Sequence, residues 1–91
     1  MIFFELKTSL HHKLFVFNDV TNFANYYLDN YYLDNEEKSI LMSLNIEKIN
    51  SLLFYNVRKE IILEDGVEIE CLGTGIIHTS TEIDLINNSN E

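Results

Sequence analysis

An apolar stripe at helical spacing lies between two regions in which apolar and polar residues alternate. The stripe repeats every three or four residues, and its members are Val20, Phe23, Ala24, Tyr27, Leu28 and Tyr31. That spacing predicts an amphipathic helix that packs one side on a core, with Asn18 or Asp19 as its N-cap. Alternation with a period of two predicts strands. Strands on both sides of a helical segment indicate the α+β class.

The segments 2–7 and 12–17 are the strand-like runs that precede the helix. Residues 8–11 between them are predicted to form the loop of an N-terminal β-hairpin. Phenylalanine occurs on both faces of this hairpin. We therefore expect the hairpin to be covered on both sides or to lie at an interface.

A second helix is predicted to begin at a capping box made by Asp34 and Glu37 and to run to about residue 44, with Ile40, Leu41 and Leu44 inward. Residues 46–57 fit either a helix or a strand; we favour a short helix or turn over 46–51 followed by a strand. The pentapeptide YYLDN occurs twice, at 26–30 and 31–35. Because five is not a helical period, we interpret the repeat as chance or replication slippage rather than as a repeat fold.

The C-terminal third is predicted to be strand throughout, with a turn at residues 64–66. A three-residue loop with a left-handed Gly66 pairs Ile61 with Ile69 and Glu60 with Glu70, which gives one wholly apolar face; Cys71 falls on that face. Residues 73–75, Gly-Thr-Gly, are predicted to connect this hairpin to a last strand. They lack the third glycine and the following helix of a dinucleotide-binding loop.

Together these elements predict one α+β domain over residues 1–86, followed by a polar tail at 87–91. The domain has an N-terminal β-hairpin, two central helices and a C-terminal antiparallel β-sheet with an acidic outer face. The length allows a single core.

No apolar run approaches the ~18 residues that a membrane helix needs. The single cysteine and the lack of a signal-peptide pattern predict a cytoplasmic protein, and eleven Asn with eleven Ile favour a low-GC bacterial or phage source.

Charge is distributed unevenly along the chain. From Glu60 to the C-terminus there are eight carboxylates and no Lys or Arg, in a chain of net charge −9. This asymmetry disfavours direct binding to nucleic acid or to an anionic membrane, and it favours a basic protein as partner. Side chains on one face of a strand repeat every ~6.6 Å, broadly like the phosphates of one nucleic-acid strand. The residues predicted to share the acidic face are Glu60, Glu68, Glu70, Glu82 and Asp84. The alternative is a solvated face without a partner.

Two tyrosines that lie off the helical stripe are further candidates for contact with a partner. Tyr26 and Tyr32 are predicted to be exposed near Asp29, and exposed aromatic rings beside acids are good interface anchors. Half-exposed tyrosines without a role are also common.

No motif in the chain indicates catalysis, a metal or a cofactor. His11, His12, His78 and Cys71 are not expected to converge as zinc requires, since neighbouring histidines on a strand point to opposite faces. The pair Glu5 and Lys7 matches the end of a nuclease triad, but no earlier acid completes it. We therefore expect no enzyme activity.

These features favour a non-enzymatic inhibitor that occludes a basic nucleic-acid-handling protein. In size, acidity and lack of catalytic motifs, the chain resembles phage-encoded inhibitors such as anti-CRISPR and anti-restriction proteins, several of which mimic DNA. No alignable motif carries this resemblance. It implies stoichiometric binding to a basic protein, a nuclease or another nucleic-acid-binding enzyme. An immunity protein or antitoxin that neutralises a basic toxin is the alternative, and a homodimer is compatible with either.

Overall fold

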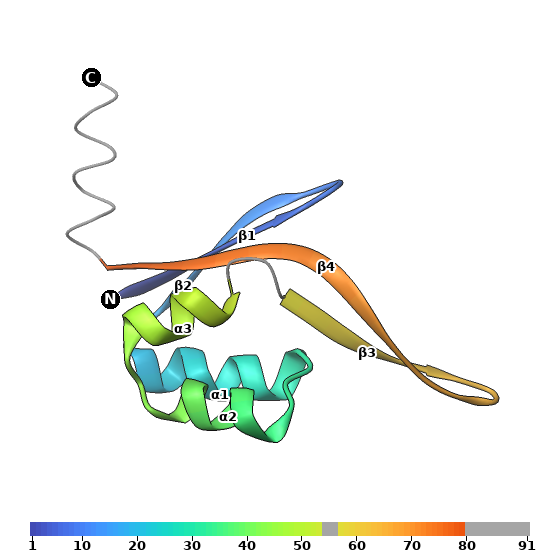
Figure 1. Ribbon diagram of the computed structural model, residues 1–91. Helices are drawn as coiled ribbons and strands as arrows, with labels where there is room; N and C mark the ends of the chain where they lie inside the picture. Colours follow the sequence, from blue (N-terminus) through green and yellow to red (C-terminus); the bar gives the residue numbers. More distant parts are fainter. Residues whose placement is uncertain (54–56, 80–91) are drawn as a thin grey trace.

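The computed structural model describes residues 1–53 and 57–79. The chain begins with strands β1 (Ile2–Thr8) and β2 (His12–Phe17). Three helices follow: α1 (Val20–Asn30), α2 (Asn35–Met42) and α3 (Ile46–Leu53). Strands β3 (Val57–Leu63) and β4 (Gly66–Thr79) complete the described part (Figure 1). The predicted α+β class is correct.

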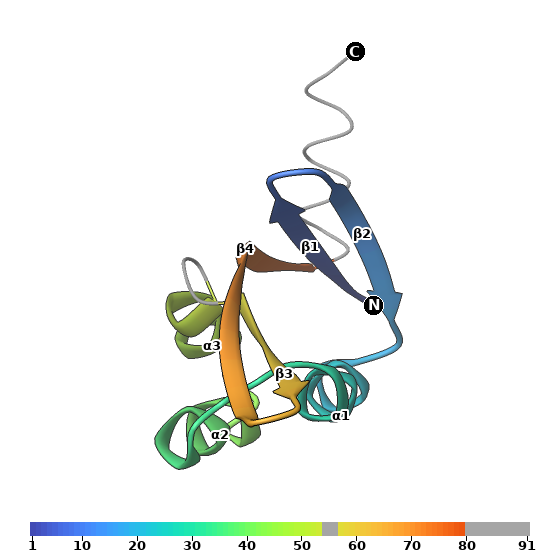
Figure 2. The same ribbon diagram turned by 90° about the vertical axis from the view of Figure 1, so that its right-hand side faces the viewer.

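The strands form one antiparallel sheet in the order β2-β1-β4-β3. The helices gather on one side of it, and the paired ends of β3 and β4 extend past them as a two-stranded ribbon (Figures 1 and 2). Among residues 1–53 and 57–79, β2 and β3 are the outermost strands of this order, so they form the two edges of the sheet.

The predicted N-terminal hairpin is confirmed. Its register pairs Ile2 with Phe17 and Phe4 with Phe15, and β4 pairs with the other side of β1. Alternate residues of β1 point to opposite faces, so Ile2, Phe4 and Leu6 are buried against the helices.

Local capping signals place the first two helices as predicted. The Asp19 side chain accepts a hydrogen bond from the Asn22 amide, at 2.9 Å, and both bonds of the Asp34–Glu37 capping box are present. However, α2 ends at Met42, and Leu44 lies beyond it with a positive φ of 57° and 36% exposure. The prediction that Leu44 points inward is therefore wrong.

A third helix replaces part of a predicted strand. Residues 52 and 53 belong to α3, so the strand expected over 52–57 does not begin at residue 52. Ile49 is fully buried, as expected if the helical spacing of apolar residues in 46–57 indicates a helix, which was the alternative interpretation of this segment. The strand begins at Val57, and residues 54–56 lie outside the described part.

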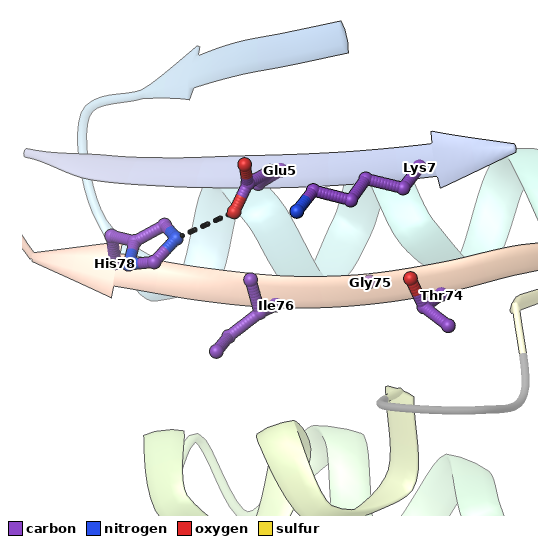
Figure 3. A pocket seen from close by; sticks show the side chains of 6 residues that line it. All are labelled: Glu5, Lys7, Thr74, Gly75, Ile76 and His78. Atoms are coloured by element: carbon purple, nitrogen blue, oxygen red, sulfur yellow. Dashed lines mark hydrogen bonds and ion pairs between the residues drawn. The ribbon is translucent and has the colours of Figure 1, made fainter. Parts of the chain in front are cut away.

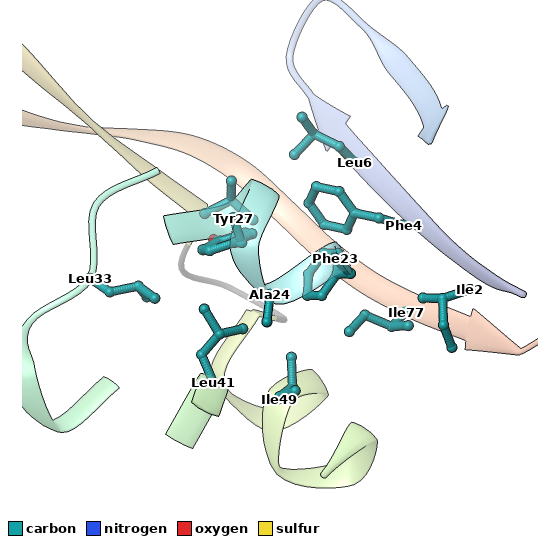
Figure 4. Close-up of a cluster of buried hydrophobic side chains, with 11 residues drawn as sticks. Ile2, Phe4, Leu6, Phe23, Ala24, Tyr27, Leu33, Leu41, Ile49 and Ile77 are labelled. Atoms are coloured by element: carbon teal, nitrogen blue, oxygen red, sulfur yellow. The ribbon is translucent and has the colours of Figure 1, made fainter. Parts of the chain in front are cut away.

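Among the residues that the structure describes, eleven buried apolar side chains make a core between the sheet and the helices (Figure 4). At its centre Phe4 meets several aromatic rings, including Phe23 at 5.2 Å and Tyr27 at 5.9 Å between ring centroids. The core residues are Ile2, Phe4, Leu6, Phe23, Ala24, Tyr27, Leu33, Leu41, Ile49, Val57 and Ile77.

Strand β4 is continuous through the Gly-Thr-Gly segment, so the predicted connection there is wrong. Gly75 leaves room for the core, because a Cβ at this position would lie 2.8 Å from the Phe4 ring and 2.9 Å from Val57. A Cβ at Gly73 would lie 2.0 Å from the carbonyl oxygen of Lys7. The two glycines therefore permit close packing within the sheet rather than a turn.

The register predicted for the β3–β4 hairpin is wrong by one residue. Leu63 pairs with Gly66 across a two-residue turn, so Glu60 lies opposite Ile69 and Ile61 opposite Glu68. Gly66 has a φ of 154° and belongs to β4 rather than to a left-handed loop position.

Candidate protein-binding surface

Residues 60–70 of the β3–β4 hairpin, which we call the acidic arm, are exposed at every position except Ile61. The arm carries five carboxylates, from Glu60, Glu64, Asp65, Glu68 and Glu70, and no Lys or Arg. All five residues are exposed. The arm projects away from the helices as a two-stranded ribbon (Figure 1), so both of its faces are open to a partner.

The acidic side chains are divided between the two faces of the arm. Residues directly opposite in register share a face, which places Glu60 with Ile62, Val67 and Ile69. Glu68 and Glu70 lie on the other face. The prediction that Glu60 shares their face is therefore wrong, and the predicted positions of Glu82 and Asp84 lie outside the described residues.

A cation also lies on the face of Glu68 and Glu70. Lys59 pairs with Glu70 in the β3–β4 register. An opposite charge directly across a strand pair offsets part of the local repulsion. The carboxylates farther along the arm have no such cross-strand partner within it.

Large apolar side chains accompany the carboxylates on the arm. Ile62 is 83% exposed and its cross-strand neighbour Val67 is 58% exposed. Cys71 shares their face, as predicted, but it is exposed rather than buried. Adjacent exposed apolar residues with a charged border are typical of protein-contact surfaces.

The base of the arm is fixed to α2 and to the segment between α1 and α2 by a cluster around Arg58. Its guanidinium donates to the Glu37 carboxylate and lies 5.1 Å from the centre of the Tyr32 ring. The Tyr32 amide also donates to the Arg58 carbonyl, at 2.8 Å. Tyr32 is half-buried here, so it was wrongly predicted to be an exposed anchor.

The other two predicted contact residues lie on α1. Asp29 is exposed near the end of the helix. Tyr26 is half-buried, with its ring 5.1 Å from that of Phe17 and 5.8 Å from that of Phe15. The prediction that Tyr26 is exposed is therefore wrong, because its ring packs on the N-terminal hairpin.

A second polar cluster lies on the face of the sheet opposite the helices, which we call the outer face. The Glu5 carboxylate accepts hydrogen bonds from Nε2 of His12, at 2.6 Å, and from Nε2 of His78, at 3.0 Å. These residues come from three adjacent strands. A pocket of about 190 Å³ lies alongside, lined by Glu5, Lys7, Thr74, Gly75, Ile76 and His78 (Figure 3).

The histidines and Glu5 were not predicted to meet, because only the pairing of β1 with β4 brings residues 5 and 78 together. The cluster links β2, β1 and β4 through side chains in addition to their backbone hydrogen bonds. Within the described residues, no group of three or more His, Cys, Asp or Glu side chains is arranged to hold a metal ion. None of the described helices is long and apolar enough to cross a membrane.

The environment of Glu5 favours its ionised form. The hydrogen bond from His78, then that from His12 and the charge of Lys7, hold the pKa of Glu5 below its usual 4.5 despite partial burial. Since the folded-state pKa is lowered, the stabilisation is present above about pH 4.5 and is lost as pH falls through the folded-state pKa.

We therefore expect the pKa of the Glu5 carboxyl to lie below 4.5 in the folded protein, and to be higher in His78→Leu, whose side chain cannot donate a hydrogen bond to it. Side-chain carboxyl NMR shifts recorded between neutral and acidic pH measure both midpoints. A midpoint in His78→Leu equal to that of the wild type would contradict the assigned role of His78.

Comparison with protein-family models, curated proteins and solved structures finds no match to this chain.

Proposed function

We propose that this protein is a non-enzymatic inhibitor that binds and occludes a basic nucleic-acid-handling protein through its acidic arm. The observation that carries the proposal is the exposure of five carboxylates on a projecting ribbon without an intervening Lys or Arg. Like charges held together in this way repel one another, a cost that a cationic partner relieves.

The shape of the arm suits a groove better than a flat surface. Carboxylates lie on both faces of the ribbon, Glu60 on one and Glu68 with Glu70 on the other. A groove that accommodates a nucleic-acid strand has cationic walls on both sides. The arm thus enters the groove and competes with nucleic acid for the same basic side chains of the partner, in the manner of a DNA mimic.

The fixed base of the arm supports this mode of binding. Contacts of Arg58 with Glu37 and Tyr32 tie the ribbon to the helices before any partner arrives. A preformed contact element loses less conformational entropy on binding than one that must first fold.

The proposal predicts that the arm's charge, rather than the protein's total charge, determines binding. Glu68→Gln with Glu70→Gln removes two arm carboxylates, and Glu36→Gln with Glu47→Gln removes two exposed carboxylates from α2 and α3. Both variants lose the same formal charge. We expect only the arm variant to weaken binding, by about tenfold, equivalent to ~1.4 kcal/mol.

Partners are captured on the immobilised protein from nuclease-treated bacterial lysate, released by a salt step and then by added duplex DNA. A basic protein that DNA displaces, and that the arm variant fails to retain, supports the proposal. Equal capture by both double variants would contradict it, as would a partner that neither salt nor DNA releases.

A further inference from the structure

Strand β2 is an edge of the sheet whose outward backbone groups can be identified. Among residues 1–53 and 57–79, β1 is the only strand paired with β2. The Thr8 amide donates to the His11 carbonyl, at 2.8 Å, which makes these two residues a hydrogen-bonded pair. Along an antiparallel strand, the N–H and C=O groups of successive residues point alternately toward the paired strand and away from it. The N–H and C=O groups of His12, Leu14 and Val16 therefore point away from the sheet.

The same three residues place their side chains on the outer face. Leu14 is 52% exposed and Val16 is 55% exposed. An edge that combines outward backbone groups with exposed apolar side chains is a template for another strand. No proline or bulge interrupts the pairing within β2.

The charge of this edge differs from that of the rest of the molecule. Residues 6–18 contain no carboxylate but include Lys7, His11, His12 and Lys13, in a chain of net charge −9. Two copies of so acidic a protein repel each other across most of their surfaces. The β2 edge is the part of the sheet where a second copy can approach with least repulsion.

We propose that the protein forms a two-fold symmetric dimer in which the β2 strands of two copies pair antiparallel, centred on Leu14. This register sets Leu14 against its own counterpart and His12 against Val16, so that the outward backbone groups meet. On the other face, Lys13 lies opposite Phe15. No two like charges are directly opposite, which satisfies the self-complementarity that a two-fold interface requires.

The ends of the paired strands are complementary in charge. The register sets His11 of one copy opposite Phe17 of the other, and Asp19 follows Phe17 by two residues. Asp19 is exposed at the start of α1. The acid at the end of each strand thus approaches the histidines at the start of the other, once on each side of the two-fold axis.

The dimer is independent of the function proposed above. Strand β3 forms the opposite edge of the sheet, so pairing through β2 leaves the acidic arm of each copy open. The dimer would present two arms to a partner. Its existence is tested on the purified protein alone, so a failure of either proposal leaves the other standing.

Sedimentation equilibrium from low to high protein concentration measures the association. We expect a dimer in the wild type, and at least about tenfold weaker association in Leu14→Lys, which places two ammonium groups face to face at the axis. The matched control is Ile62→Lys, the same class of change at an exposed arm position, and it should dimerise normally. A monomeric wild type, or equal association in Leu14→Lys and wild type, would overturn the proposal.

Amide hydrogen exchange tests the interface without any substitution. In the dimer, the amides of His12, Leu14 and Val16 should be protected at high concentration and should lose protection on dilution. The amides of Lys13, Phe15 and Phe17 face β1 and should stay protected throughout. Protection of the first set that does not change with concentration would rule out a second copy as the occupant of the edge, and so would rapid exchange at every concentration.

Discussion

Phe4→Ala should destabilise the protein by about 3–5 kcal/mol, the usual cost of removing a fully buried phenylalanine. Phe4 has no exposed surface, and its ring contacts those of Phe15, Phe23, Tyr27 and Tyr31. A domain of this length is expected to have a total stability of roughly 5–14 kcal/mol. The variant should therefore lose a large part of its stability, which denaturant unfolding followed by circular dichroism would measure.

Phe3→Ala is the matched control, because Phe3 is the same residue one position earlier on the same strand. It lies on the outer face, where it is only partly buried. Its removal should cost clearly less than that of Phe4. Equal losses for the two variants would show that the core is not centred on the inward face of β1.

The elements that the sequence predicted best depend on contacts within a few residues. The stripe from Val20 to Tyr27 and the capping box of Asp34 and Glu37 act over three or four positions, so composition and spacing are sufficient to place them. The N-terminal hairpin was predictable for the same reason. The helical state of Leu52 could not be predicted in this way. The apolar residues around it fit both the helical period and the strand period, so their spacing does not select between the two.

The prediction of the β3–β4 register was wrong because the assumption behind it does not hold at the acidic arm. Choosing the pairing that gives one apolar face assumes that a layer covers that face. The structure leaves Ile62 and Val67 exposed, so burial cannot select the register there. The two-residue turn at Glu64 and Asp65 determines it instead, and the carboxylates are divided between the faces as a result.

The contacts that shape the two candidate surfaces are long-range in sequence. Glu37 and Arg58 are 21 residues apart, and Glu5 and His78 are 73 apart. Charge composition predicted that the C-terminal third would be acidic, but it could not predict which side chains meet. Tyr32 illustrates the difference, since the Arg58 guanidinium over its ring makes it part of the arm's base.

The second large effect is expected at Gly73, where a single added methyl group should separate two strands. A Cβ there would lie 2.0 Å from the carbonyl oxygen of Lys7 and 3.1 Å from the Cα of Thr8. These are backbone atoms of β1 and cannot rotate away, so β4 must move and strain its pairing with β1. Gly73→Ala should cost at least ~2–3 kcal/mol, at the upper end of the usual cost of overpacking.

Gly66→Ala makes the same chemical change at nearly the same backbone angle, since φ is 154° at Gly66 and 158° at Gly73. No atom lies within 4 Å of a Cβ at Gly66. Any conformational cost of replacing glycine is thus shared, and the difference in unfolding free energy between the variants isolates the steric clash. If Gly66→Ala proves as destabilising as Gly73→Ala, the close approach of β4 to β1 is not what requires glycine at position 73.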